Sequence, residues 1–299
     1  MLSAHEAFGD GAELVVVDRP DGLATLALYE LENGAIALAG MEPTWGFACP
    51  LVGPNPEVLA AETAECASML PWDHLLLPGF PDDLHLARRV APAFGRFGSV
   101  MGGPGIGRQV ANITDLDRWW LHRSSRFRRN LRRARITAQA AGLRFVDLSD
   151  EPTSSGARAL IDRLVGIELR TWKGQGSIND EEFLPTGIAA PDMQNFYRRM
   201  TDRLVARGRA RVVIATLDGV DVGYILGGIR NGRYRGLQLS FTTEVRALSV
   251  GHLLQLHEIQ HLAETGLAHT YDLGMDMDYK RAWADGVEQS ITLIVNRES

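Results

Sequence analysis

Two tight-turn dipeptides in the last third of the chain restrict its fold more than any other feature. Asp218-Gly219 and Asn231-Gly232 each separate two apolar segments of strand length. Asp-Gly and Asn-Gly are the dipeptides that two-residue hairpins prefer, because both turn positions need a positive φ. The segments around them are therefore predicted to form an antiparallel sheet of three strands, at residues 211–217, 222–230 and 235–242.

A helix and two further strands are expected after this sheet. The helix covers Gly251–Thr265 and ends at Gly266, and the strands cover His269–Leu273 and Ile291–Val295. The first third of the chain repeats the order of hairpin, strand, helix and strand, with Glu32-Asn33-Gly34 as its hairpin turn. The predicted fold class is α+β, with two similar lobes that each contain a mixed, mostly antiparallel sheet flanked by helices.

The length and composition fit two lobes, which we place at residues 1–115 and 116–299. The chain has 299 residues, of which 45% are hydrophobic, and this exceeds the needs of most single domains. Its two cysteines, Cys49 and Cys66, lack the spacing of metal ligands, as is typical of a reducing compartment. The first ten residues do not resemble a signal peptide, and no apolar run reaches the roughly 18 residues of a membrane span. We therefore expect a cytoplasmic protein.

The middle of the chain is predicted to be mostly helical. One long helix is expected from near Arg118 to Ala141, and a second covers Leu160–Trp172. Lys173–Pro191 is rich in Gly, Asn and Pro and is predicted to be a loop. Gly102–Gly107 is interpreted as a turn between the lobes, because a proline removes an N–H group there and no lysine follows, unlike in a nucleotide-binding loop.

The segment Glu244–Gly251 is the strongest candidate for a ligand site. It joins the third strand of the sheet to the following helix, where several backbone N–H groups lack a helical partner and the helix dipole adds partial positive charge. A pyrophosphate suits such a position. The alternative is an ordinary helix start with Ser249 as its N-cap.

This segment and several others resemble one enzyme family. The spacing Arg246-x-x-Ser249-x-Gly251 is similar to the coenzyme A loop of GNAT acyltransferases, with serine in place of their first glycine. Other segments resemble the GNAT branch of cellulose-biosynthesis acetyltransferases and the related Fem-type peptidyltransferases, which carry two GNAT-like lobes. These segments are Arg123–Arg133, Glu168 with Trp172-Lys173, Arg207-Gly208, Asp272–Gly274, and Tyr279-Lys280 with Trp283. The resemblance extends from about Trp119 to the end, whereas the first 110 residues resemble the family only in their order of elements, as a degenerate lobe.

The resemblance implies an N-acyltransferase that uses acetyl-CoA or another acyl-CoA without a metal. A β-bulge after the third strand would open the sheet for the pantetheine arm, and the amine would enter from the cleft between the lobes. The expected donor-binding residues are Arg246, Ala247, Leu248, Ser249, Val250, Gly251 and His252. Transfer is expected to be direct, since no cysteine lies near this site in the sequence.

The proton-transfer groups are expected near the ends of the last strands. Asp272 and Tyr279 are the main catalytic candidates, and Glu244 is a weaker candidate base. Asp276 and Asp278 lie in the same segment. For Asp272 the alternative is capping of a turn with Gly274, and for Tyr279 and the other candidates it is packing or a solvated charge.

The acceptor is left open as a small-molecule, sugar or peptide amine, and an acyl carrier protein could deliver the acyl group. Glu168 and Trp172 are predicted to share one helix face and to line the substrate pocket, although packing is an equal alternative for Trp172. Lys280 and Arg126 are the other expected substrate contacts. A non-catalytic protein that binds coenzyme A is a further alternative.

Two patterns compete with this interpretation. His257-Glu258-Ile259-Gln260-His261 matches the zinc-protease motif H-E-x-x-H, but Glu264 stands where metzincin spacing needs glycine, and the two histidines are expected on the solvent side. Seven arginines lie between Arg123 and Arg135 with no acid among them, although the formal net charge of the chain is −6. Such a face suits a phosphate-rich partner such as an aminoacyl-tRNA, which Fem-type enzymes use as donor, or it pairs with acids of the second lobe.

Overall fold

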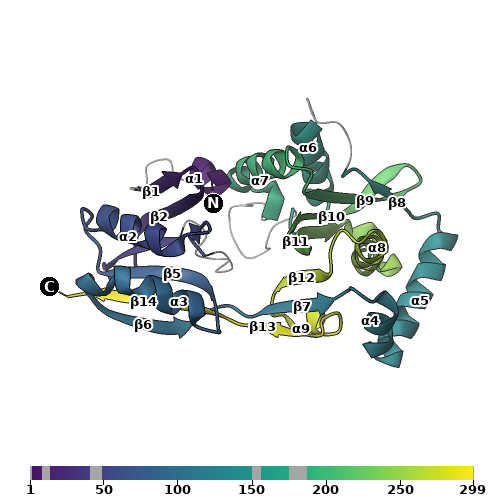
Figure 1. Ribbon diagram of the computed structural model, residues 1–299. Coiled ribbons are helices and arrows are strands. Elements are labelled where there is room, and N and C mark those ends of the chain that lie inside the picture. The colour runs from purple at the N-terminus through teal and green to yellow at the C-terminus, as the bar shows by residue number, and fades with distance from the viewer. Residues whose placement is uncertain (1, 9–13, 41–48, 150–155, 175–186, 299) are drawn as a thin grey trace. The chain divides into compact units, whose positions relative to one another are not determined.

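The computed structural model describes residues 2–8, 14–40, 49–149, 156–174 and 187–298 (Figure 1). The chain divides into two compact units, Met1–Gly107 with Glu288–Ser299, and Arg108–Val287. Each unit contains one seven-stranded mixed sheet with helices packed on it. The predicted α+β class with two lobes, each a mixed and mostly antiparallel sheet, is confirmed.

The first unit contains a sheet in the order β1-β2-β3-β5-β14-β6, with β4 paired to β2. Only β3 and β5 run parallel in the described pairings of this sheet. The strands are β1 (Leu14–Arg19), β2 (Gly22–Glu30), β3 (Ile36–Gly40), β4 (Leu51–Val52), β5 (His74–Pro81), β6 (Gly98–Pro104) and β14 (Ser290–Arg297). The helices are α1 (Leu2–Phe8), α2 (Pro56–Ala67) and α3 (His85–Val90), followed by the 3₁₀ turns η1 (Ala91–Ala93) and η2 (Gly95–Phe97). The predicted hairpin between β2 and β3 is confirmed, with Gly34 at φ +80° in its turn.

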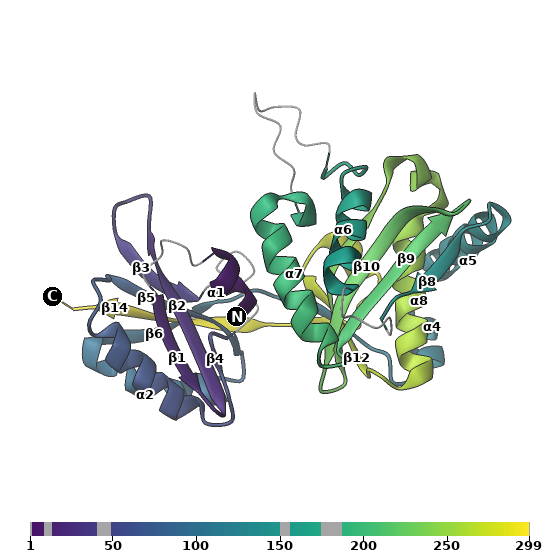
Figure 2. The same cartoon turned by 90° about the horizontal axis from the view of Figure 1, so that it is seen from above.

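The second unit contains a sheet in the order β13-β7-β12-β11-β10-β9-β8. The strands are β7 (Arg108–Asn112), β8 (Arg144–Asp147), β9 (Ala210–Leu217), β10 (Val220–Arg230), β11 (Arg233–Phe241), β12 (Thr270–Met275) and β13 (Gly286–Glu288). Its helical segments are α4 (Leu116–His122), α5 (Ser125–Ala140), α6 (Gly156–Glu168), η3 (Gly187–Ala189), α7 (Pro191–Val205), η4 (Thr243–Leu248), α8 (Val250–Thr265) and α9 (Asp278–Arg281). Figures 1 and 2 show α6 and α7 on one face of this sheet and α8, covered by α5, on the other. The predicted antiparallel strands β9, β10 and β11 are confirmed.

The division between the units differs from the predicted one at residue 115 in two respects. Residues 108–112, which the predicted boundary assigned to the first lobe, form β7 and pair with β12 in the second sheet. Strand β14, expected in the second lobe, lies between β5 and β6 in the first sheet. The prediction of a turn over Gly102–Gly107 is wrong for its first part, which belongs to β6. A Cβ on Gly103 would lie 2.6 Å from Ile294 Cδ1, so this glycine allows β6 to lie close to β14.

The predicted long helix near Arg118 is two helices. Asp115 accepts a hydrogen bond from the Arg118 N–H at the start of α4, and Ser124 accepts one from the Phe127 N–H at the start of α5. Between the two helices, Arg123 is extended and buried, and its guanidinium donates hydrogen bonds to Asp285 and to the Trp119 carbonyl. The serine cap and the buried arginine therefore separate the helices.

Other predictions in the middle of the chain have mixed outcomes. Helix α6 ends at Glu168 rather than at Trp172. Residues 175–186 of the predicted loop lie outside the described residues. No helix of the described part is long and apolar enough to cross a bilayer.

Candidate functional site

The central strands of the second sheet separate over half of their length. Strands β11 and β12 pair only where Arg233–Arg235 faces Thr270–Asp272. Beyond that point β11 continues along β10, and a β-bulge leaves Leu237 without a partner, because Leu226 faces Gln238 and Gly227 faces Gly236. The expected bulge thus lies within the third strand of this sheet rather than after it. Because a bulge bends its strand, it moves β11 away from β12 and opens the sheet.

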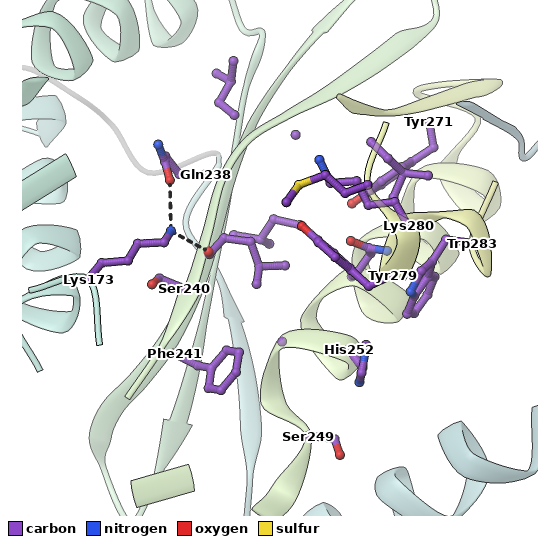
Figure 3. A pocket seen from close by; sticks show the side chains of 18 of the residues that line it. Lys173, Gln238, Ser240, Phe241, Ser249, His252, Tyr271, Tyr279, Lys280 and Trp283 are labelled. Carbon is purple, nitrogen blue, oxygen red and sulfur yellow. Dashed lines mark hydrogen bonds between the residues drawn. The ribbon is translucent and has the colours of Figure 1, made fainter. Parts of the chain in front are cut away.

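A cavity of about 720 Å³ occupies this opening (Figure 3). One wall is β11 from Gly236 to Phe241, and the others come from the start of α8, from α9 and from the segment after α6. In Figure 3, Lys173 lies on one side of the β11 ribbon, and Tyr279, Lys280 and Trp283 lie on the other. The cavity is therefore lined by side chains from both sides of β11.

The predicted loop lies at one end of this cavity. Arg246, Ser249, Gly251 and His252 line it, whereas Leu248 and Val250 pack into the apolar core beneath. Ala247 lines a second cavity of about 370 Å³ between the loop and α5, and both cavities share Ser249 and His252. The loop residues are thus divided between the two cavities and the apolar core. Partial burial lowers the pKa of the His252 imidazole.

The start of α8 has no side-chain cap. Ser249 is the N-cap residue but makes no capping hydrogen bond, and it has φ 56° and ψ 36°. The alternative of an ordinary serine-capped helix start is therefore correct for the position of Ser249, but the capping hydrogen bond is absent. A Cβ on Gly251 would lie 2.8 Å from Phe241 Cε1, so a glycine here lets the helix start approach β11. The first N–H groups of α8 are therefore free of a side-chain cap at the cavity wall.

Replacing Ser249 by Gly is expected to raise the free energy of unfolding by about 0.5–1 kcal/mol. The left-handed conformation costs serine more than glycine, and the greater unfolded-state freedom of glycine offsets part of the gain. Urea denaturation measures the change. The matched control is Gly266→Ser at the other end of α8, where φ is 68° and an added Cβ would meet no heavy atom within 4 Å. That variant should lose stability, and a loss in Ser249→Gly as well would contradict the account.

Tyr279 and Lys280 both line the cavity, as expected of site residues. They belong to α9, and the Lys280 ammonium lies 5.7 Å from the centre of the Tyr279 ring. Burial raises the pKa of Tyr279 and lowers the pKa of Lys280, because each charged form loses hydration. Lys280 Nζ also donates a hydrogen bond to the Met275 carbonyl at 3.2 Å.

Asp272 is fully buried where β11 and β12 meet, and it does not line the cavity. Its Oδ1 accepts the Gly274 N–H at 2.8 Å, which is the turn cap that the sequence left as an alternative. Its Oδ2 lies 3.2–3.6 Å from guanidinium nitrogens of Arg108, Arg233 and Arg235. These contacts give Asp272 a role in joining β7, β11 and β12 at the closed end of the opening.

The remaining acidic candidates lie outside the cavity. Glu244 is exposed in η4, and a hydrogen bond from Thr242 lowers its pKa. Asp276 accepts a hydrogen bond from Gln109, which lowers its pKa, and Asp278 is exposed beside Arg281. None of them lies among the described residues of the cavity wall.

Glu168 and Trp172 do not share a helix face, because α6 ends at Glu168. Glu168 is fully buried, and the Tyr224 hydroxyl donates to its Oε2 at 3.2 Å. Trp172 is 69% exposed at the cavity wall. The next residue, Lys173, was not predicted as a site residue, yet it lines the cavity with Nζ 3.6 Å from Glu168 Oε1. Its position in the motif Trp172-Lys173 is the feature of the sequence that could have identified Lys173 as a site residue.

Helix α5 carries the arginine run on its surface. Arg126 is exposed and lines neither cavity, whereas Arg133 lines the smaller one. Arg123 is buried and pairs with Asp285. Among the described residues, no carboxylate forms an ion pair with any arginine of α5 itself. The arginines of α5, which exclude Arg123, therefore form a solvated positive face beside the smaller cavity.

The H-E-x-x-H segment of α8 has a structural explanation. Glu258 is fully buried, and Arg211 binds both of its oxygens, at 2.9 and 3.0 Å. His257 stacks on Phe145, and His261 Nε2 lies 3.8 Å from Asp147 Oδ2. Both histidines are half-buried against β8 rather than on the solvent side. The described part of the chain contains no group of three or more His, Cys, Asp or Glu that could hold a metal ion.

A model of the acetyltransferase (GNAT) domain family matches residues 125–281, which is more than half of the chain. No curated protein sequence shows significant similarity. Solved structures share the fold over nearly the whole length of the chain, among them the following three.

The first of these structures is the C-terminal domain of a putative lysylphosphatidylglycerol synthetase from Agrobacterium fabrum. It is 11% identical, with a TM-score of 0.63 over 98% of this chain and 87% of that one. L-PGS from Bacillus licheniformis is 12% identical, with a TM-score of 0.62 over 100% and 88%. FemX is 14% identical, with a TM-score of 0.60 over 98% and 90%. At these identities the likeness concerns the fold alone.

Proposed function

The chain belongs to the acetyltransferase (GNAT) domain family, and we propose that it is an N-acyltransferase that moves an acetyl or longer acyl group from an acyl-CoA to a primary amine. The observation that carries the proposal is the opening between β11 and β12, which ends at the uncapped start of α8. The opening suits the extended arm of a thioester donor, and the start of α8 suits the pyrophosphate at the end of that arm.

The proposed donor site uses backbone groups more than side chains. The N–H groups at the start of α8, together with the Arg246 guanidinium, suit the pyrophosphate. The part of β11 from Gly236 to Phe241 pairs with β10 on one side and faces the cavity on the other. Its outward-facing N–H and C=O groups suit the amides of a pantetheine arm, in the manner of strand pairing.

The proposed reaction is direct attack of a neutral amine on the thioester. None of the described residues of the cavity wall is a cysteine, so the site offers no thiol for an acyl-enzyme. The N–H of Leu237, the extra residue of the bulge in β11, suits the oxyanion that forms at the thioester carbonyl. Tyr279 is proposed as the acid that donates a proton to the departing sulfur.

Release of free thiol from acetyl-CoA in the presence of primary amines tests this function. Thiol release that depends on the amine, with the N-acyl product detected by mass spectrometry, is the expected result. Longer acyl-CoA donors and an acyl carrier protein in the same assay define the donor. Acyl transfer only from aminoacyl-tRNA, or none from any thioester, would contradict the proposal.

A second candidate is an aminoacyltransferase that takes its acyl group from aminoacyl-tRNA. The observation that favours it is the positive face of α5, which has no ion pair with a described carboxylate and lies beside the smaller cavity. Arginine is well suited to phosphate oxygens. The resemblance to Fem-type enzymes and the fold shared with FemX agree with this candidate. Loss of donor binding after RNase treatment would separate it from the acyl-CoA proposal.

A further inference from the structure

The cavity contains every lysine of the chain. The sequence has 31 lysines and arginines together, and only two of them, Lys173 and Lys280, are lysines. Both line the cavity, although they lie far apart in the sequence and on different elements. A lysine has a compact ammonium with three donors that adapt to a ligand, whereas the planar fork of arginine is fixed. The use of lysine at these two positions alone points to a role in ligand binding.

The charge of the cavity wall is entirely positive. Its described residues include three cations, Lys173, Arg246 and Lys280, and no aspartate or glutamate. Arg246 lies at the α8 end, where the donor phosphates are proposed. Lys173 lies on the other side of β11 from Tyr279 and Lys280 (Figure 3), which places it toward a second ligand.

The structure fixes the Lys173 ammonium in place at the cavity wall. Nζ lies 3.5 Å from Gln238 Oε1, 3.4 Å from the Leu239 carbonyl and 3.6 Å from Glu168 Oε1. Glu168 is in turn held by the Tyr224 hydroxyl. Lys173 is thus an oriented cation next to the strand that faces the proposed thioester.

Glu168 cannot itself serve the ligand as a second charge. It is fully buried and absent from the cavity wall. A Cβ on Gly187 would lie 2.6 Å from Glu168 Oε1, so the glycine backbone closes over this oxygen. Glu168 is therefore a positioning residue for Lys173 rather than a group that binds an ammonium.

We propose that the acceptor is an anionic amine, with a carboxylate or phosphate group that Lys173 binds. This inference rests on the proposed N-acyltransferase function. An acceptor with several positive charges would lose hydration in this cavity without gaining a carboxylate partner, whereas an anionic group gains a charge-assisted hydrogen bond. Nearby cations also lower the pKa of the acceptor amine and so favour the neutral form that attacks.

Three small amines with the same two-carbon spacer test the charge preference. β-Alanine carries a carboxylate, O-phosphoethanolamine a phosphate and ethanolamine a neutral hydroxyl. Their binding to the full-length protein is measured by ligand-observed NMR, and their acylation by acetyl-CoA by thiol release. At least one anionic amine should bind about tenfold more tightly than ethanolamine, as expected for one charge-assisted contact. The preferred member of the pair identifies the anionic group.

Variants at Lys173 assign the preference to its charge. Lys173→Met should remove the difference between the amines, and Lys173→Arg should retain it. Arg158→Met, which removes an exposed cation of α6 outside the cavity, is the matched control and should change nothing. Equal binding of the three amines, no binding of either anionic amine, or a preference that persists in Lys173→Met would overturn the inference.

The outcomes for the inference and for the proposed function are distinguishable. Acetyl-CoA binding is measured separately on the same wild-type protein. If acetyl-CoA binds but the amines show no charge preference, the inference fails and the proposed function stands. If acetyl-CoA does not bind, the proposed function fails whatever the amines do.

Discussion

Replacing Tyr279 by Phe is expected to lower kcat for acyl transfer by roughly two to four orders of magnitude, the contribution typical of a general acid. The hydroxyl is the only part of the side chain that changes, and the ring lines the cavity beside Lys280. Because 58% of the residue is exposed, the change should have little effect on stability. Steady-state thiol release measures kcat, and urea denaturation checks the fold.

The pH dependence of the rate provides an independent test of Tyr279. Partial burial raises its pKa above the ordinary value of 10.0, and the protonated form is the active acid. Activity that depends on this proton should therefore be present throughout the neutral range and be lost only as the pH rises through the raised pKa. Tyr29→Phe, a partly buried tyrosine of β2 in the first unit, is the matched control. A Tyr279→Phe variant with nearly wild-type kcat would contradict the proposed role.

Replacing Glu258 by Gln should destabilise the protein by about 3–5 kcal/mol, because it leaves the buried guanidinium of Arg211 without its buried carboxylate partner. Both carboxylate oxygens of Glu258 are bound by that guanidinium, and neither group is accessible to solvent by more than a few per cent. Asp147 contacts the same guanidinium at 2.7 Å and compensates for part of the loss. Urea denaturation with an unchanged m-value measures the effect.

The Glu258 variant also separates a structural role from the zinc-hydrolase alternative. Glu264→Ala removes an exposed acid of the same helix and should change the free energy of unfolding by less than about 0.5 kcal/mol. If Glu258 were instead the base of a metalloprotease, Glu258→Gln would leave stability nearly unchanged and abolish an EDTA-sensitive hydrolysis. That pair of results would contradict the structural account.

Local features of the sequence predicted the three hairpin-connected strands of the second sheet. The turns at Asp218-Gly219 and Asn231-Gly232 fixed the neighbours β9, β10 and β11, since each hairpin is set by a few adjacent residues. The helix stop at Gly266 was predicted for the same reason, and its φ of 68° agrees. The break between α4 and α5 was missed although Ser124 is a good N-cap, because the apolar spacing continued through it.

Strand pairing over long distances could not be predicted from the sequence. The pairing of β14 with β5 and β6 joins residues about two hundred positions apart, and no local pattern encodes that choice. The surroundings of Asp272 depend on the same kind of pairing, because Arg108 comes from β7 and Arg235 from β11. The sequence could place Asp272 at a strand end but could not show the arginines around it.

The sequence predicted several residues of the cavity wall but not Lys173. The spacing from Arg246 to Gly251 and the position of Tyr279 indicated the cavity wall where the structure has it. Lys173 was not predicted, because the spacing of four residues favoured Glu168 and Trp172, whose ring is exposed. The scarcity of lysine in a chain rich in arginine could have indicated Lys173, because only two positions of the sequence carry lysine.

Calorimetric titration of acetyl-CoA into the EDTA-treated protein tests the central claim, a thioester site in the opening between β11 and β12, most directly. The account predicts micromolar binding to the wild-type protein and to an Arg230→Ala control, which removes an exposed arginine at the end of β10. Arg246→Ala should bind at least about tenfold more weakly, through loss of one charge-assisted phosphate contact. No binding to the wild-type protein at millimolar acetyl-CoA, or equal binding to Arg246→Ala, would contradict the claim.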